Sequence, residues 1–75
     1  MIAAYVFAQI GAVDPGGVID KIRALDGVKQ AHSVLGPTDC IAFIEAADMD
    51  AFFSAIGAIR SVGGIESTDT RLVAY

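Results

Sequence analysis

The sequence is short of the residues on which several common functions of small domains depend. It has one cysteine, Cys40, and one histidine, His32, so it lacks the side chains for an internal disulfide or a zinc module. Only five lysines and arginines stand against nine acidic residues, a net charge of -4. Nucleic-acid backbones are held by clustered cations, so this acidic chain is a poor candidate for binding them. We therefore expect no metal, no other cofactor and no direct contact with nucleic acid.

Long hydrophobic runs and targeting signals are also lacking. No apolar run reaches the ~18 residues that a membrane helix needs. The N-terminus has no basic region of the kind that opens a secretory signal, and Asp14-Pro15-Gly16 follows soon after it. We expect a cytoplasmic protein that does not enter a membrane.

What the sequence does have is a high apolar content in a short chain. Its 75 residues predict a single domain over 1–75, at the low end of what folds alone. Hydrophobic residues make up 55% of the chain, although a domain of this size has little interior. We infer that a second chain covers part of the apolar surface.

The pattern of apolar and turn-forming residues predicts the element order β-α-β-β-α-β. β-Branched, aromatic and alternating residues predict four strands, at 2–10, 28–35, 40–46 and 65–74. This order is typical of the α+β class and of the ferredoxin-like sandwich, in which two helices cover one face of a four-stranded antiparallel sheet.

The two helices are predicted from their first residues, their glycine stops and their apolar stripes. Asp14 and Asp48 can accept from first-turn N–H groups, and Gly27 and Gly63-Gly64 are placed to end the helices. The stripes consist of Val18, Ile19, Ile22 and Leu25 in the first helix, and of Phe52, Phe53, Ile56 and Ile59 in the second. A weak repeat at a spacing of 37 aligns the end of the first helix with that of the second, Ile22–Val28 with Ile59–Ile65.

The polarity of the strands fits the usual strand order of this fold, 4-1-3-2. The segments 2–10 and 40–46 are apolar on both faces and belong in the centre of the sheet, whereas the other two carry polar residues and belong at its edges. Because both helices cover one face, the other keeps apolar side chains, either a set with Tyr5 and Phe7 or one with Val6. We predict that this open face packs against a second copy across a two-fold axis.

Most chemically active side chains have an ordinary structural interpretation. His32 lies on an edge strand as a surface histidine, and Cys40 is interpreted as a buried thiol with nothing nearby to lower its pKa. Arg23 and Arg60 occupy equivalent places in the repeat and are expected on solvated helix faces. The alternative function is that of a small dimeric α/β-barrel enzyme, and it would depend on His32, the only histidine.

Two polar segments favour a binding site instead. The turn 36–39 holds Thr38 and Asp39 at the mouth of a strand, and Thr68 and Thr70 lie on one face of the last strand. A carboxylate with hydroxyls and backbone N–H groups suits a zwitterion: the carboxylate holds an ammonium group, and the donors hold the ligand's own carboxylate.

These segments and several others resemble one known family over essentially all of the chain. The landmarks are Ala4-Tyr5-Val6, Pro15-Gly16, Leu25-Asp26-Gly27-Val28, Gly36-Pro37-Thr38-Asp39-Cys40-Ile41, Glu45-Ala46, and the run from Ile59-Arg60-Ser61-Val62 through Gly64-Ile65 to Ser67, Thr68 and Thr70. They are similar to those of the effector domain, or RAM domain, of the Lrp/AsnC feast/famine transcription regulators.

The resemblance implies a fold, an assembly and a function. The fold is the same βαββαβ sandwich, and two domains pair through their open sheet faces before dimers assemble into rings, commonly octamers. Free amino acids bind between dimers, with no catalysis. Gly36 and Asp39 match the family's Gly-x-x-Asp turn, Asp39 facing the ligand's ammonium group. Thr68 and Thr70 match threonines that line the same cleft, and we add Thr38 to this site.

The resemblance also implies a relation to transcription. Regulators of this family carry an N-terminal helix-turn-helix, whereas this sequence starts at the first strand and is similar to stand-alone RAM proteins. We expect a non-catalytic effector module linked to the regulation of amino-acid metabolism, which assembles with itself and can also join full-length Lrp/AsnC-type regulators. A purely structural oligomer whose ligand site has decayed is a further alternative.

Overall fold

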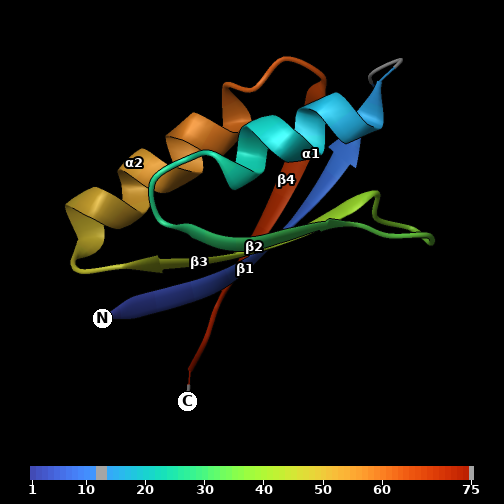
Figure 1. Cartoon of the computed structure of the whole chain (residues 1–75). Coiled ribbons are helices and arrows are strands. Elements are labelled where there is room, and N and C mark those ends of the chain that lie inside the picture. Colours follow the sequence, from blue (N-terminus) through green and yellow to red (C-terminus); the bar gives the residue numbers. More distant parts are fainter. Residues whose placement is uncertain (12–13, 75) are drawn as a thin grey trace.

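The computed structural model describes residues 1–11 and 14–74; Ala12, Val13 and Tyr75 lie outside this range. Its elements follow the predicted order (Figure 1): β1 (Ile2–Ile10), α1 (Pro15–Arg23), β2 (Val28–Ser33), β3 (Cys40–Ala46), α2 (Met49–Arg60) and β4 (Ile65–Leu72). The fold is a ferredoxin-like sandwich, as the sequence predicts.

The four strands form one antiparallel sheet in the order β2-β3-β1-β4. This is the predicted order 4-1-3-2, with the two strands that are apolar on both faces in the centre. Both helices lie on the same side of the sheet (Figure 1). α1 packs against β2, and α2 packs against β3 and β4.

The helices begin where the sequence predicts but end earlier. The Asp14 side chain accepts from Gly17 N at 3.1 Å, and that of Asp48 accepts from Ala51 N at 2.8 Å. α1 ends at Arg23 rather than at Gly27, and α2 ends at Arg60. Gly27 and Gly64 instead form the turns that lead into the next strands, where their φ angles of 88° and 101° favour glycine.

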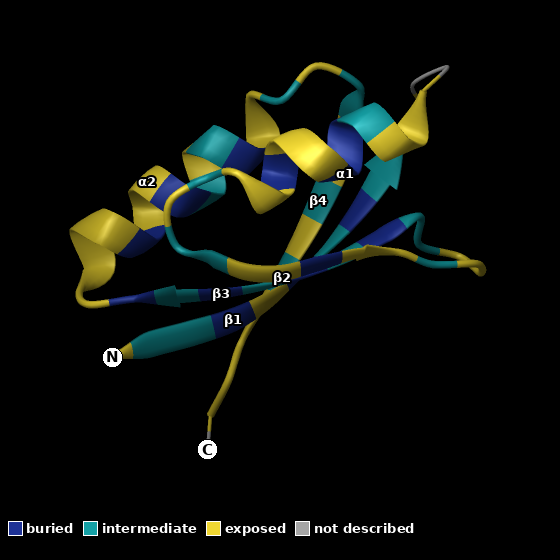
Figure 2. Ribbon diagram, in the orientation of Figure 1, coloured by how far each residue is buried: buried dark blue, intermediate teal, exposed yellow. Residues whose placement is uncertain are grey.

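The core lies between the helices and the inner face of the sheet (Figure 2). Alternate residues of the central strands supply it, which settles that Ala4 and Val6 face the helices and Tyr5 does not. From the second helix the core takes Phe52, Ala55 and Ile59. The expectation that Phe53 widens this stripe was wrong: its side chain is 62% exposed, because Ala55, three residues after Phe52, completes the buried face.

Two strands are shorter than predicted. β2 ends at Ser33, and the following residues form the connection to β3, which is closed by a hydrogen bond of 3.0 Å from Val34 N to Asp39 O. Leu35 is fully exposed in this connection. β4 ends at Leu72, two residues before the predicted end. Hydrophobic character extended both predictions. One further backbone hydrogen bond follows each strand, from Val34 N to Asp39 O and from Val73 N to Ala3 O, but the regular pairing ends before these residues.

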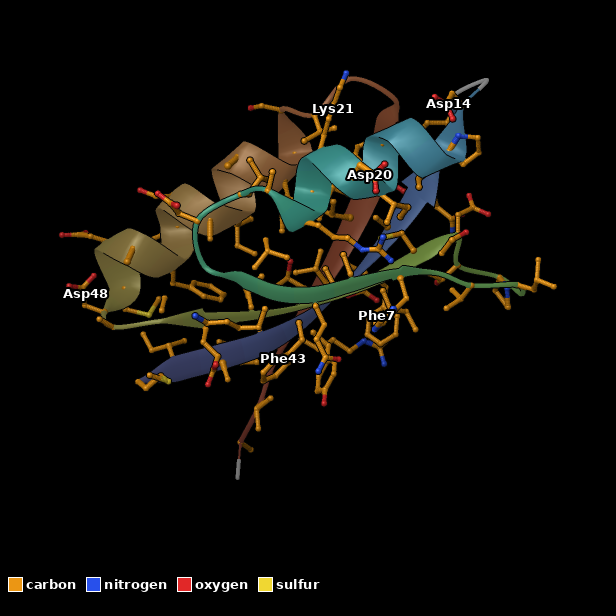
Figure 3. All side chains as sticks on the ribbon, in the orientation of Figure 1. Phe7, Asp14, Asp20, Lys21, Phe43 and Asp48 are labelled. Atoms are coloured by element: carbon orange, nitrogen blue, oxygen red, sulfur yellow. The ribbon has the colours of Figure 1, made fainter. Side chains whose placement is uncertain are left out.

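The open face of the sheet carries an aromatic cluster opposite the helices. Phe7 and Phe43 lie on the side of the sheet away from α1 and α2 (Figure 3). The ring centroids of Tyr5 and Phe43 are 4.9 Å apart, and the Arg71 guanidinium lies 5.2 Å from the ring centroid of Phe7. The described helices include none that is long and apolar enough to cross a membrane.

Candidate functional site

The turn between β2 and β3 holds the first three predicted site residues. Gly36 is exposed with a φ of 138°, and Thr38 and Asp39 are half-buried. Asp39 Oδ2 accepts from the backbone N of Ile10 at 2.9 Å, and Asp39 N donates to Ala8 O at 3.1 Å. The Asp39 carboxylate therefore holds the end of β1 in place.

A side-chain hydrogen bond attaches the same turn to β1 a second time. The Gln9 side-chain amide donates to the carbonyl of Pro37. Backbone and side-chain bonds from three consecutive β1 residues thus reach the turn. The turn is a fixed extension of the sheet, which gives its carboxylate a defined position.

Thr68 and Thr70 lie on the helix side of the edge strand β4. They pair with Ala8 and Val6 of β1, which are both buried beneath the helices, so the two threonine side chains point the same way. Both are half-buried, at the margin of the core. Here β4 and the end of α2 form an open cleft of about 530 Å³, lined by Ile56, Arg60, Ile65, Glu66, Ser67, Thr68 and Thr70.

Two charged residues of this cleft were missed as site residues by the sequence interpretation. Arg60, in the last turn of α2, was assigned to a solvated helix face, and Glu66 was assigned no role. β4 has a register shift between Gln9 and Ile10, so that Ile65 rather than Glu66 pairs with Ile10. Glu66 is the extra residue of this bulge, and bulges commonly redirect side chains next to binding sites. The bulge could not be read from the sequence.

The five predicted residues do not line one cavity in a single chain. Cys40 and Thr68 both pair with Ala8, one on each side of β1, so they are two strand spacings or about 10 Å apart. The cleft contains Thr68 and Thr70, whereas Gly36, Thr38 and Asp39 lie beyond β1. The two groups flank the same end of β1.

The remaining candidates have mostly the structural surroundings that the sequence predicts. Cys40 is 1% exposed, as predicted, and burial raises the pKa of its thiol. The prediction that nothing nearby lowers this pKa was wrong, because the charge of Arg23 acts in that direction. His32 is exposed on the edge strand β2. Arg23 is exposed, as predicted, but its Nε also donates to Ala31 O at 2.8 Å and so binds the edge strand β2. No three histidine, cysteine, aspartate or glutamate side chains come together among the described residues in a way that could hold a metal ion.

Comparison with known proteins identifies the family. The model of the Lrp/AsnC ligand binding domain matches residues 4–74, nearly the whole chain. The chain belongs to this family. Its topology is that of the Lrp/AsnC ligand binding domain, and both the β2–β3 turn and the cleft lie within the matched residues. A comparison with curated proteins found no significant match.

Solved structures place this Lrp/AsnC domain among similar folds. A protein from Thermus thermophilus superposes with a TM-score of 0.90 at 28% identity, covering 100% of this chain and 95% of that one. A hypothetical protein from Pyrococcus horikoshii gives 0.89 at 26% identity, covering 100% and 92%. A transcriptional regulator from Neisseria meningitidis, solved as a complex with L-Met, gives 0.84 at 21% identity, covering 99% of this chain and 50% of that one. This chain therefore spans about half the length of that regulator.

Proposed function

We propose that this Lrp/AsnC domain is a non-catalytic, cytoplasmic effector module that binds a free amino acid and couples its binding to self-assembly. The observation that carries the proposal is the pair of threonine side chains on one face of β4, in a cleft that an arginine also lines. Thr68 and Thr70 can donate to a small polar ligand, and the guanidinium of Arg60 matches a carboxylate in shape and charge. The Neisseria regulator and a feast or famine regulatory protein from M. tuberculosis, each solved with L-methionine, support the ligand class.

The turn residues contribute to the same proposal. Asp39 fixes Ile10, whose partner across the ladder is Ile65 in the wall of the cleft. Gly36 and Thr38 complete the turn that holds this carboxylate. When domains assemble, the turn of a neighbouring copy, with its Thr38 hydroxyl, is available to close the cleft, as the family resemblance implies for a site between dimers.

Assembly through the open sheet face is the second part of the proposal. The aromatic cluster of Tyr5, Phe7 and Phe43 is exposed or half-buried on one face of a small domain, and a second copy would remove it from water. Dimers would join further into an octamer or another ring. The same face would admit full-length Lrp/AsnC-type regulators, and so link the module to the regulation of transcription.

The mechanism would be thermodynamic linkage. A ligand shifts an assembly only by its difference in affinity for the two states. An amino acid at 100 times its dissociation constant stabilises the binding-competent state by about 2.7 kcal/mol. This is enough to change the distribution between dimers and larger assemblies without any chemical step.

Native mass spectrometry with and without the twenty amino acids tests the proposal. We expect assembly above a dimer, with one amino acid retained or with the distribution of oligomers shifted. A ligand-free dimer that is indifferent to all twenty would contradict the proposal and favour the decayed, purely structural oligomer.

Matched variants then locate the site. Thr68→Val keeps the shape of the side chain and removes the hydroxyl, so we expect it to lower the affinity for the retained amino acid by about tenfold. Thr38→Val makes the same change in the turn and measures whether the turn contacts the ligand. Wild-type affinity in Thr68→Val would exclude the cleft as the site.

A further inference from the structure

The two halves of the chain carry equivalent arginines that differ in their hydrogen bonds and ion pairs. The spacing of 37 pairs Arg23 with Arg60. Arg23 has two partners within its own half: its Nε donates to Ala31 O at 2.8 Å, and its guanidinium lies 3.5 Å from the carboxylate of Asp20. A third arginine, Arg71, is also engaged, because it contacts the carboxylate of Asp69 at 3.0 Å.

In the second half the corresponding partners of the arginine are missing or unused. The position equivalent to Asp20 is Gly57, which has no carboxylate to offer Arg60. The position equivalent to Ala31 is Thr68, whose carbonyl does not accept from Arg60. Over the residues that the structure describes, no side-chain hydrogen bond or ion pair occupies the Arg60 guanidinium, although it lines the cleft beside the threonines.

A carboxylate, that of Glu66, lines the same cleft. Glu66 is the extra residue of the β4 bulge, and its exposed side chain lies against Gly11. Gly11 in turn donates to Gly64 O at 2.9 Å, which ties this part of the backbone to the start of β4. The cleft is thus lined by one cationic, one anionic and three hydroxyl side chains, the last being those of Ser67, Thr68 and Thr70.

We propose that Arg60 binds the carboxylate, and Glu66 the ammonium group, of an α-amino acid whose two charged groups are both free. This inference rests on the proposed function and names the polar anchors within it. It differs from the expectation that Asp39 faces the ammonium group, because one oxygen of that carboxylate already accepts from Ile10 N. Carboxamides and N-acylated amino acids lack one of the two charges and would be rejected.

Ligand analogues combined with variants test each anchor separately. The amino acid retained in the mass-spectrometric screen is titrated by calorimetry beside its carboxamide, which lacks the carboxylate charge, and its N-acetyl derivative, which lacks the ammonium charge. In the wild type we expect each analogue to bind about 10- to 100-fold more weakly, as for the loss of a charged hydrogen bond. In Arg60→Gln the acid and its carboxamide should bind alike, and in Glu66→Gln the amine and its N-acetyl derivative should bind alike.

Controls keep failure of the anchors distinct from failure of the fold or of the site. Lys21→Gln removes the same charge from the last turn of α1, outside the cleft, and should keep the wild-type preference for the acid. Circular dichroism and thermal unfolding establish that each variant is folded. If the wild type binds an amino acid but Arg60→Gln and Glu66→Gln keep the full discrimination, this inference is wrong and the proposed function stands. If Asp39→Asn binds the amine and its N-acetyl derivative alike but Glu66→Gln still prefers the amine, then Asp39 in the turn, and not Glu66, binds the ammonium group. If the wild type binds no amino acid, both proposals fail.

Discussion

Replacing Asp39 with alanine would measure how much its carboxylate contributes to the free energy of unfolding. Asp39 Oδ2 accepts from the partly buried N–H of Ile10 at 2.9 Å, and charged hydrogen bonds of this kind contribute about 1.5–3 kcal/mol. Alanine leaves that N–H without its acceptor, so we expect the free energy of unfolding to fall by about 2 kcal/mol. For a domain of this size the melting temperature should then fall by about 8–16 °C. Asp39→Asn keeps an acceptor oxygen and should lose about half as much.

Urea unfolding at one fixed protein concentration is the suitable assay, because assembly makes apparent stability depend on concentration. Asp26→Ala is the matched control: Asp26 is exposed and makes no side-chain hydrogen bond within the described part of the chain, so its loss should change stability by no more than about 0.5 kcal/mol. If Asp39→Ala unfolds like the wild type but no longer binds an amino acid, the structural role is refuted and the carboxylate contacts the ligand.

Three further predictions follow from the fold. Gly57 lies in the exposed middle of α2 with open space around it, so Gly57→Ala should raise the free energy of unfolding by about 0.5–1 kcal/mol. Gly27 has a φ of 88°, so Gly27→Ala should lower the free energy of unfolding by about 1–2 kcal/mol. Equal effects of the two substitutions would contradict the different backbone conformations of these glycines. Phe43→Glu should convert the assembly to monomers in native mass spectrometry, while Phe53→Glu, on the outer side of α2, should leave the dimer intact; a dimer that survives the first change would place its interface elsewhere. Burial raises the pKa of the Cys40 thiol, which stabilises the folded protein while the thiol is protonated, and this contribution is lost as the pH rises through the folded pKa. A thiol reagent at pH 8 should therefore label Cys40 only on unfolding, and fast labelling of the folded protein would contradict its burial.

The order and placement of the strands could be predicted because polarity differs between them. β1 and β3 are apolar on both faces, which fits only the centre of a sheet with helices on one side, and Asp14 and Asp48 mark the helix starts by their capping chemistry. The ends of the elements were harder to predict. Gly27 has the expected positive φ, but α1 ends at Arg23, because a glycine signals a change of direction and not the last helical hydrogen bond.

The candidate site could be predicted only in part. Thr68 and Thr70 were found because alternation along a strand places them on one face. Glu66 was missed because its position depends on a bulge, and a bulge is set by the pairing with β1 rather than by local sequence. Arg60 was present in the repeat, but the sequence does not show that the partners available to Arg23 are absent from the second half.

The unequal use of the two arginines bears on how specificity could change over evolution. The polar residues of the cleft are exposed or half-buried and do not belong to the hydrophobic core, whereas Ile56 and Ile65 line the cleft and also pack against that core. Substitutions at exposed polar positions usually change stability by no more than about 0.5 kcal/mol. Because the arginine that supports the edge of β2 and the arginine that lines the cleft are different residues, polar substitutions in the cleft can change the ligand without disturbing the contact of Arg23 with β2.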